Sequence, residues 1–430
     1  MKKILAILLA LLLLAAAAGC GPAQSEQQEA AFSPSMDTGA TADIEIVGKL
    51  DNFEALEAVI KDFNAVYPNV TVSYSKMDNY NTVLADRVLG SDPPEIFMSL
   101  RSYFEINPQL LEATLDLSDA GLDTGIIDPE VIEGCTKDGK LVRLPLMLNY
   151  QGIAVNTSLL EKEGLKIPQT YDEFISTCDA LVSKGYTPLQ GFPDTIYAML
   201  LFNEWRIRLS QEDNAGEIFE QLNAGADGCG SYLEKSFEIL EDYRERGYYD
   251  AAVNDQITDS YDAAILHFFE GNTPFLVCSA EAMSGMKKRE TKSEAFTASP
   301  FAYEFTELPV SDAGANAVVD IWSGFSVVKN SANVLWAEEF MRFLCTADEL
   351  NKMASVKGMP TAVRGGNADA RYADLEQLGA GQKKTIGAIG VSNAVSAAYA
   401  DCAKKIGTGA CTAQQAADGF AAAVQAQLGK

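Results

Sequence analysis

Histidine is almost absent from the sequence, since His267 is the only one among 430 residues. This excludes a metal site built from several histidines and the two-histidine zinc motif of metalloproteases, and a Ser–His–Asp triad would have to use His267. The GxxxxGK[ST] phosphate loop and the GxSxG nucleophile elbow are missing as well. With 60 acidic residues, pairs of carboxylates arise by chance and do not indicate a catalytic pair. We therefore expect a protein that is not an enzyme, with an exported hydrolase as the remote alternative.

Positive charge is also scarce. There are 33 Lys and Arg against 60 Asp and Glu, which gives a net charge of −27. Nucleic acids and anionic membrane surfaces bind Lys/Arg clusters, so neither is expected as a partner. A hydrophobic content of 47% with 22% charged residues is typical of a globular chain, and the length is enough for two or three domains.

The cysteines form no CxxC pair, and an odd number, seven, follows Cys20. At least one thiol is then expected to be free in an exported chain. Cys278 and Cys345 lie in apolar runs and are expected in the core. A disulfide between Cys402 and Cys411 is the one pairing left open.

The first 20 residues, MKKILAILLALLLLAAAAGC, have two lysines, an apolar run and small residues before Cys20. They predict an export signal over residues 1–19. Ala17-Ala18-Gly19-Cys20 looks like a bacterial lipobox, so the thiol of Cys20 is expected to be acylated with palmitate-like chains. Residues 21–41 are rich in Gly, Pro, Ser, Gln and Ala, so a flexible tether is expected over residues 20–41. The predicted location is the cell membrane, lipid-anchored on its extracellular or periplasmic face. The alternatives are an ordinary signal peptide or a membrane helix with a chance cysteine.

Alternating strand and helix patterns follow the tether. The expected order is strand, helix, strand, helix, strand over 42–50, 52–68, 70–75, 81–90 and 93–99. This order indicates an α/β layer with a largely parallel sheet. No cofactor is expected from these patterns.

Further elements are predicted downstream. Thr170 with Glu173 forms a capping-box pattern before a helix, and one strongly amphipathic helix is expected over residues 333–355. Strands are expected at 140–145, 152–155, 273–278 and 318–328, and helices at 231–247 and 413–429.

Four stretches in this order resemble one family. They cover residues 63–99, 138–174, 268–286 and 323–364, including DGKLVRLPLMLNYQGIAVNTS, FFEGNTPFLVCSAEAMSGM and KGMPTAVR. Behind a lipobox, this order is similar to the sugar-binding extracellular solute-binding lipoproteins of ABC importers, the family that includes maltose-binding protein. The chain departs from the family pattern in VNTS, where Tyr-Asn-Lys is frequent, and in lacking a Trp after FLVC.

The resemblance implies a two-lobe fold of the periplasmic-binding-protein type (type II), with hinge-linked α/β lobes around a ligand cleft. It places hinge crossovers near residues 146–150 and 320–325. Lobe 1 would hold 42–147 plus 326–370, and lobe 2 would hold 151–320 plus 371–430. Ligands of open α/β sheets bind beyond the carboxyl ends of strands, and such lobes close by a hinge.

Candidate ligand residues follow from these positions, because sugars need aromatic faces and polar partners for their hydroxyls. They come after predicted strands, in the crossovers, or from lobe 2. They are Asp51, Asn52, Ser99, Arg101, Tyr103, Asn149, Tyr150, Trp205, Glu281, Asp320 and Trp322, with Phe192 and Tyr197 as weaker candidates.

Each candidate has a structural alternative. Asp51 and Asn52 could cap the helix that follows them. Arg101 could bind hydroxyls or a carboxylate, or be a solvated surface charge. Trp205 could line the cleft or pack between helices. Trp336, on an amphipathic helix, is expected in the core.

The expected function is therefore capture of a mono- or oligosaccharide by a monomer that delivers it to ABC permease subunits. The alternatives are a binder of a peptide, polyamine or other small polar solute, and a sensor lipoprotein without a transport role. No metal is expected in the site.

Overall fold

A computed structural model describes residues 32–191, 196–254, 261–310, 316–366, 369–372, 375, 383–387 and 389–429. The predicted export signal, Cys20, the tether up to residue 31 and the candidate Phe192 lie outside these residues. The chain divides into two compact units, Met1–Ser33 and Pro34–Lys430, and all the described helices and strands belong to the second unit.

One sheet runs through this unit. Its order is β2-β1-β3-β10-β6-β8-β7, with β11 beside β10 and β9 beside β6. β1, β2 and β3 are parallel, whereas β10 is antiparallel to β3 and to β6. The strand bounds are β1 Ala42–Gly48, β2 Val70–Lys76, β3 Ile96–Ser99, β6 Leu144–Asn156, β7 Leu189–Gly191, β8 Phe275–Ser279, β9 Tyr303–Thr306, β10 Ala317–Val327 and β11 Lys383–Thr385, and a separate hairpin pairs β4 Thr136–Lys137 with β5 Lys140–Leu141.

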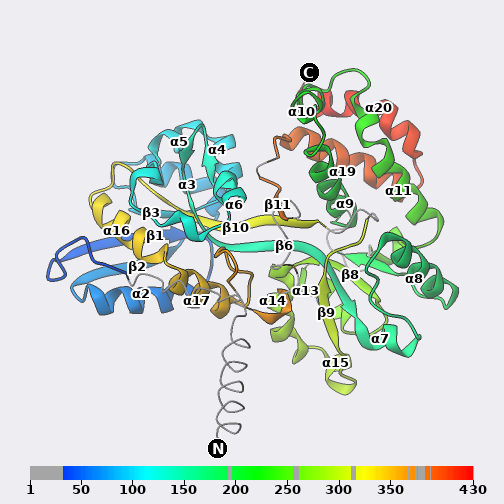
Figure 1. Cartoon of the computed structure of the whole chain (residues 1–430), viewed down its shortest axis with the longest axis horizontal. Coiled ribbons are helices and arrows are strands. Elements are labelled where there is room, and N and C mark those ends of the chain that lie inside the picture. The colour runs from blue at the N-terminus through cyan, green and yellow to red at the C-terminus, as the bar shows by residue number, and fades with distance from the viewer. Residues whose placement is uncertain are drawn as a thin grey trace, which may run out of the picture. The chain divides into compact units, whose positions relative to one another are not determined.

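The long strands β6 and β10 connect two groups of elements (Figure 1). The first lobe has β1–β3 with α2 (Glu54–Val66), α3 (Tyr80–Leu89), α4 (Arg101–Ile106), α5 (Pro108–Ala113), α6 (Pro129–Gly134), α16 (Val334–Leu344) and α17 (Ala347–Lys357). The second lobe has β7–β9 with α7 (Thr157–Lys162), α8 (Tyr171–Ser183), α9 (Ile196–Leu209), α10 (Ala215–Ala224), α11 (Glu234–Glu245), α12 (Ala251–Asn254), α13 (Tyr261–Phe268), α14 (Ala280–Glu290), α15 (Glu294–Ala298), α19 (Asn393–Gly407) and α20 (Ala413–Gln427). The exact lobe boundaries remain a prediction.

Residues 140–155 were expected to form two strands with a break between them, and this is wrong. β6 is continuous because residues 144–151 pair antiparallel with β10, and residues 151–156 then pair with β8 and β9. These partners satisfy the backbone of the aromatic-polar segment around Asn149. The register with β10 shifts on both sides of Ser323, next to Trp322, as at a β-bulge.

The single helix expected over residues 333–355 is two helices, α16 and α17. The break lies at Cys345 and Thr346, and Thr346 is extended with φ −110° and ψ 151°. The sequence Thr346-Ala-Asp-Glu349 matches the capping-box pattern that marks the start of a helix. Hydrophobic periodicity alone does not detect this pattern. By contrast, the predicted Thr170 cap forms, since the Glu173 amide donates to Oγ1 of Thr170 over 3.2 Å.

Part of the predicted tether is held to the first lobe. The amide and hydroxyl of Ser35 donate to the carboxylate of Glu339 on α16, over 2.8 and 2.6 Å. The chain is therefore bound from Ser35 onward, before β1 begins.

The seven cysteines of the described residues are all free, so no disulfide joins Cys402 and Cys411. Cys278 and Cys345 are buried, as expected of core residues. Among the helices in this part of the chain, none is both long enough and apolar enough to cross a membrane.

Candidate functional site

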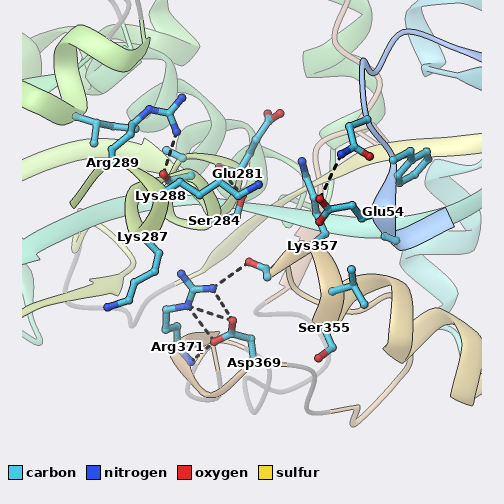
Figure 2. Close-up of a pocket in the computed structure, with 18 of the residues that line it drawn as sticks. Glu54, Glu281, Ser284, Lys287, Lys288, Arg289, Ser355, Lys357, Asp369 and Arg371 are labelled. Carbon is cyan, nitrogen blue, oxygen red and sulfur yellow. Dashed lines mark hydrogen bonds and ion pairs between the residues drawn. The ribbon is translucent and has the colours of Figure 1, made fainter. Parts of the chain in front are cut away.

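A large pocket lies between the two lobes. Its volume is about 840 Å³, and we call it pocket 1. The first lobe contributes the start of α2 and the end of α17, and the second lobe contributes α13 and α14. Figure 2 shows Glu54 and Lys357 on one side of this space and Glu281, Lys288 and Arg289 on the other.

Aromatic side chains lie at the first-lobe end of pocket 1. Phe53 lines it and packs edge-to-face against Trp322 of β10, with ring centres 6.4 Å apart. Trp322 is only 9% exposed and lies behind Phe53 rather than on the lining. Phe53 is itself only 3% exposed and also packs against Tyr74 and Phe325, so neither ring offers an open face to the pocket.

Two charged side chains of pocket 1 have no protein partner among the described residues. The Glu281 amide donates to Oδ1 of Asn149 over 3.0 Å, but its carboxylate makes no hydrogen bond or ion pair there. The same holds for the ammonium group of Lys288. A free carboxylate and a free ammonium group on the wall of a pocket can bind the hydroxyls of a polar solute.

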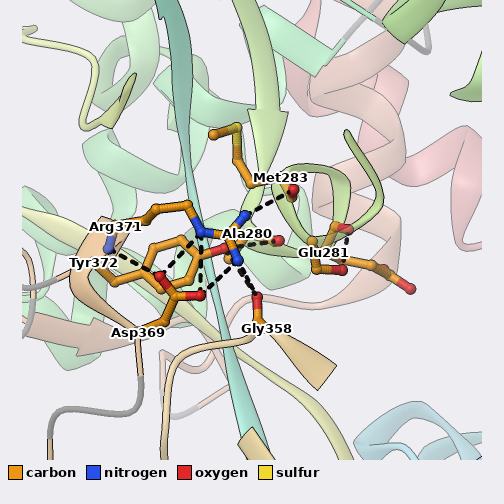
Figure 3. A network of polar contacts seen from close by, with 8 residues as sticks. Ala280, Glu281, Met283, Gly358, Asp369, Arg371 and Tyr372 are labelled. Carbon is orange, nitrogen blue, oxygen red and sulfur yellow. Dashed lines mark hydrogen bonds and ion pairs between the residues drawn. The ribbon is translucent and has the colours of Figure 1, made fainter. Parts of the chain in front are cut away.

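Arg371 and Tyr372 link the lobes at the edge of pocket 1 (Figure 3). The Arg371 guanidinium donates to Asp369, to the Met283 carbonyl over 3.0 Å and to the Gly358 carbonyl over 3.2 Å. The hydroxyl of Tyr372 donates to the Ala280 carbonyl over 3.1 Å. Because Arg371 hydrogen-bonds to it, the pKa of the Asp369 carboxyl lies below its usual value. This network forms a wall that joins the end of α17 to α14.

A second interlobe pocket, pocket 2, has a volume of about 680 Å³. It is lined by Arg101 of α4, Arg143 before β6, Arg206 of α9 and Asp320 of β10, together with residues 385–387 and 389–394. The candidates Arg101 and Asp320 therefore meet here, whereas Asn52 and Glu281 meet in pocket 1.

Asp51 and Asn52 do not cap α2. Asp51 forms an ion pair with Lys76 over 2.7 Å, and Asn52 donates to the Glu54 side chain over 3.2 Å. The N-cap residue of α2 is Phe53, which has no polar side chain. Both Asp51 and Asn52 also line a smaller surface pocket beside α2.

Neither interlobe pocket is lined by Asp51, Asn149 or Trp322, and four further candidates also lie away from both pockets. Ser99 is buried and donates to the Gly324 carbonyl, and the Tyr103 hydroxyl donates to Asn81. Tyr150 packs against Tyr372. The Trp205 indole donates to the Tyr232 carbonyl over 2.8 Å. This contact agrees with the helix-packing alternative for Trp205 rather than with a place in the ligand cleft.

The remaining aromatic candidates are packed as well. Tyr197 stacks on Tyr249 with ring centres 4.2 Å apart. Trp336 is buried against Tyr67, in the core as expected.

Sequence reasoning missed several residues of the two pockets. Lys357 begins the KGMPTAVR stretch, which carries part of the family resemblance, but nothing in that stretch marked its side chain as a ligand. Arg143 and Arg206 carried no signal of their own, because nothing local distinguishes a buried arginine from a surface one. Their position depends on the pairing of β6 with β10 and on the packing of α9.

Known proteins resemble this chain over most of its length. A curated relative, the "Multiple sugar-binding protein" of Streptococcus mutans, is 24% identical over 335 residues, which is 73% of each chain. The apo structure of RafE from Streptococcus pneumoniae matches with a TM-score of 0.68 and 18% identity, covering 92% of this chain and 99% of that one. A family 1 extracellular solute-binding protein from Bifidobacterium longum subsp. infantis matches with a TM-score of 0.67 and 19% identity, covering 91% and 100%.

These structures confirm the two-lobe α/β fold that the resemblance implied. The family model of the bacterial extracellular solute-binding proteins matches residues 48–349. Its members are binding proteins rather than enzymes. The chain therefore belongs to the family of bacterial extracellular solute-binding proteins.

Proposed function

We propose that this protein captures a carbohydrate between its lobes, in pocket 1, and delivers it to an ABC permease while anchored to the membrane through Cys20. Relatives described as a multiple sugar-binding protein, as RafE in complex with raffinose and as a chitin oligosaccharide binding protein support the ligand class.

The observation that carries the proposal is the lining of pocket 1. Glu54 and Lys357 of the first lobe and Glu281 and Lys288 of the second lobe line the pocket, and their polar groups can hydrogen-bond to the hydroxyls of a sugar. Because these groups come from both lobes, a bound solute can contact both at once when the lobes are closed. It then favours the closed form by the difference between its affinities for the closed and open forms. No chemical step is needed.

The lining of pocket 1 also bears on the alternative solutes. Its cationic residues outnumber its acids: Lys287, Lys288, Arg289, Lys357 and Arg371 face Glu54, Glu281 and Asp369. A polyamine, which is a polycation, fits this lining poorly. A peptide or another small polar solute remains the competing ligand class.

The first experiment screens for the ligand by thermal shift over mono- and oligosaccharides, peptides, amino acids and polyamines, since a ligand of the native state raises the midpoint. We expect a saccharide to give the largest shift. Glu281→Gln is then expected to weaken binding of that saccharide about tenfold or more, because it loses a charge-assisted hydrogen bond.

Glu294→Gln is the matched control, because Glu294 is another exposed acid of the second lobe that lines neither interlobe pocket. It should leave the affinity unchanged. A screen in which only peptides or polyamines bind would overturn the carbohydrate proposal.

Closure can be tested by solution scattering with the saccharide found in the screen. A hinge between lobes predicts a smaller radius of gyration in the bound form. An unchanged radius at saturating ligand would refute closure.

The anchor can be tested with Cys20→Ala. This variant should be released into the medium or remain an unprocessed precursor, because a stable attachment needs the acyl chains. A processed Cys20→Ala protein that stays on the membrane would disprove lipidation.

Delivery to a permease is tested separately in cells. Deletion of the protein should abolish uptake of the labelled saccharide. Unchanged uptake together with saccharide binding in vitro would favour the sensor alternative.

A further inference from the structure

Pocket 2 gathers positive charge in a chain of net charge −27. Its cationic lining residues are Arg101, Lys137, Arg143 and Arg206, and its acidic ones are Glu105 and Asp320. Glu105 is already engaged, since it accepts from Nε of Arg101 over 3.2 Å. The interior of the pocket therefore has more guanidinium groups than carboxylates.

Arg143 and Arg206 are buried without an ion pair. They are 3% and 7% exposed, and neither forms a salt bridge within the described residues. Arg143 donates to the Gly134 carbonyl over 3.0 Å. A neutral carbonyl satisfies a donor but leaves its charge uncompensated, and a buried uncompensated charge is costly.

Arg206 keeps an unused donor. Its two Nη atoms donate to Oδ1 of Asn203 over 3.1 Å and to the Ile386 carbonyl over 2.9 Å, while its buried Nε has no partner. Burial, which is the main cause, and the positive charge of Arg101 lower the pKa of Arg206 to about 10, although Asp320 opposes them. Burial therefore disfavours the charged guanidinium of Arg206 more than the nearby Asp320 favours it.

Asp320 is a carboxylate that lies near both buried arginines. It lies opposite Asn149 across the β10–β6 pair, and its Oδ1 accepts from the Ile321 amide over 2.8 Å. Burial raises the pKa of Asp320 in spite of Arg143 and Arg206, so the protein solvates this carboxylate poorly. Two guanidinium groups and one carboxylate leave a positive charge for a ligand to balance.

The pocket draws its walls from both lobes, as a capture site does. Arg101 belongs to the first lobe, and a Cβ added to Gly387 would lie 3.5 Å from the Cδ of Arg101. Arg206 and the polar residues Asn223, Ser392 and Asn393 complete the lining. The volume of about 680 Å³ lies within the 300–1,000 Å³ typical of small-molecule sites.

We infer that pocket 2 binds the carboxylate of an acidic sugar, such as a hexuronate, through Arg101, Arg143 and Arg206. Arginine is suited to this task because its planar fork binds carboxylates through two parallel hydrogen bonds. The inference rests on the proposed capture of a carbohydrate and adds a second subsite: pocket 1 takes a neutral sugar unit and pocket 2 takes an anionic one.

The test measures binding of D-galacturonate and D-glucuronate by calorimetry, with D-galactose and D-glucose as neutral counterparts at the same ionic strength. We expect each uronate to bind at least tenfold more tightly than its neutral counterpart. Acetate and inorganic phosphate are further probes, and both should bind much more weakly than the uronates.

Two variants separate a binding role from a structural one. Arg101→Met should weaken uronate binding about tenfold and leave the neutral sugars unaffected. Arg87→Met is its control, because Arg87 is also ion-paired and its side chain is similarly exposed, at 30% against 31%. Asp320→Asn should tighten uronate binding, since it removes the carboxylate that competes with the ligand for the two buried arginines.

The outcomes distinguish this inference from the proposed function. Neutral sugars that bind as tightly as uronates, or an Asp320→Asn variant whose uronate affinity is unchanged, would overturn the inference and leave carbohydrate capture in place. Acetate or phosphate binding as tightly as uronates would also overturn it, because the sugar would then add nothing. Failure of all saccharides, including oligomers, would overturn the proposed function itself.

Discussion

Nζ of Lys357 lies 5.3 Å from the ring centre of Trp322. Lys357 ends α17 and lines pocket 1, whereas Trp322 lies in the crossover strand β10. An ammonium group over an indole face is attractive by about 0.5–2 kcal/mol, depending on desolvation. The contact fixes the end of a first-lobe helix over the strand that leads into the second lobe.

Trp322 is expected to act through packing. Trp322→Ala should lower the free energy of unfolding by about 3–5 kcal/mol, as large-to-small core substitutions do. Trp322→Phe, which keeps an aromatic ring against Phe53, should cost less. Urea denaturation measures both, with the screened saccharide titrated against each folded variant. An alanine variant that is stable but no longer binds would show instead that Trp322 contacts the ligand.

Glu339 is expected to stabilise the fold in a pH-dependent way. Burial alone would raise the pKa of Glu339, but hydrogen bonds from Ser35, Tyr67 and Arg342 outweigh it and lower the pKa below the usual 4.5. A carboxyl with a lowered folded pKa adds stability above its unfolded pKa and loses it as pH falls through the folded value. Glu339→Gln should therefore destabilise the protein near pH 7 by about 3 kcal/mol, and less below pH 4.5.

The neighbouring Glu338 serves as the control for Glu339. Burial raises the pKa of Glu338, which is the opposite direction. Glu338→Gln should leave stability unchanged or slightly increased near pH 7. Equal destabilisation by the two substitutions would contradict the assigned network.

Glu204 on α9 is expected to make stability fall as pH rises. Burial raises its pKa from 4.5 to about 8. Between these values the folded chain holds a proton that the unfolded chain has released, so the free energy of unfolding decreases with pH by up to about 1.4 kcal/mol per unit. Chemical denaturation from pH 4.5 to 8 should show a smaller decrease for Glu204→Gln. As a control, replacing the exposed Glu212 by Gln should leave the slope of unfolding free energy against pH as in the wild type. The same slope in the wild type, Glu204→Gln and Glu212→Gln would contradict the prediction.

Two glycines should respond to alanine with opposite signs. A Cβ on Gly230 would lie 2.0 Å from the Ala417 carbonyl oxygen of α20, whereas one on Gly419, within α20, meets nothing within 4 Å. Gly230→Ala should destabilise by about 1–3 kcal/mol through overpacking. Gly419→Ala should stabilise by about 0.5–1 kcal/mol, because alanine is the better helix former. Thermal unfolding of both variants checks the prediction, and a neutral Gly230→Ala would refute the close approach.

The sequence by itself determined the local elements. The spacing of Phe53, Leu56 and Val59 predicts the amphipathic face of α2, and the structure buries all three. Thr170 and Thr412 begin helices through their own hydroxyls, since each bonds an amide three residues ahead. These features depend on contacts within a few residues, so a pattern along the chain is enough to predict them.

Only the tertiary structure decided how the candidate site is divided. Arg101, Arg143, Arg206 and Asp320 line one pocket although they are far apart in the sequence, and Asn52 and Glu281 line another. Tyr150 and Trp205, chosen for residue type and position, lie in packed regions instead. The physical reason is that the register of β6 on β10 sets Asn149 opposite Asp320, and the packing of α9 brings Arg206 beside them. These long-range contacts leave no periodic signal in the chain.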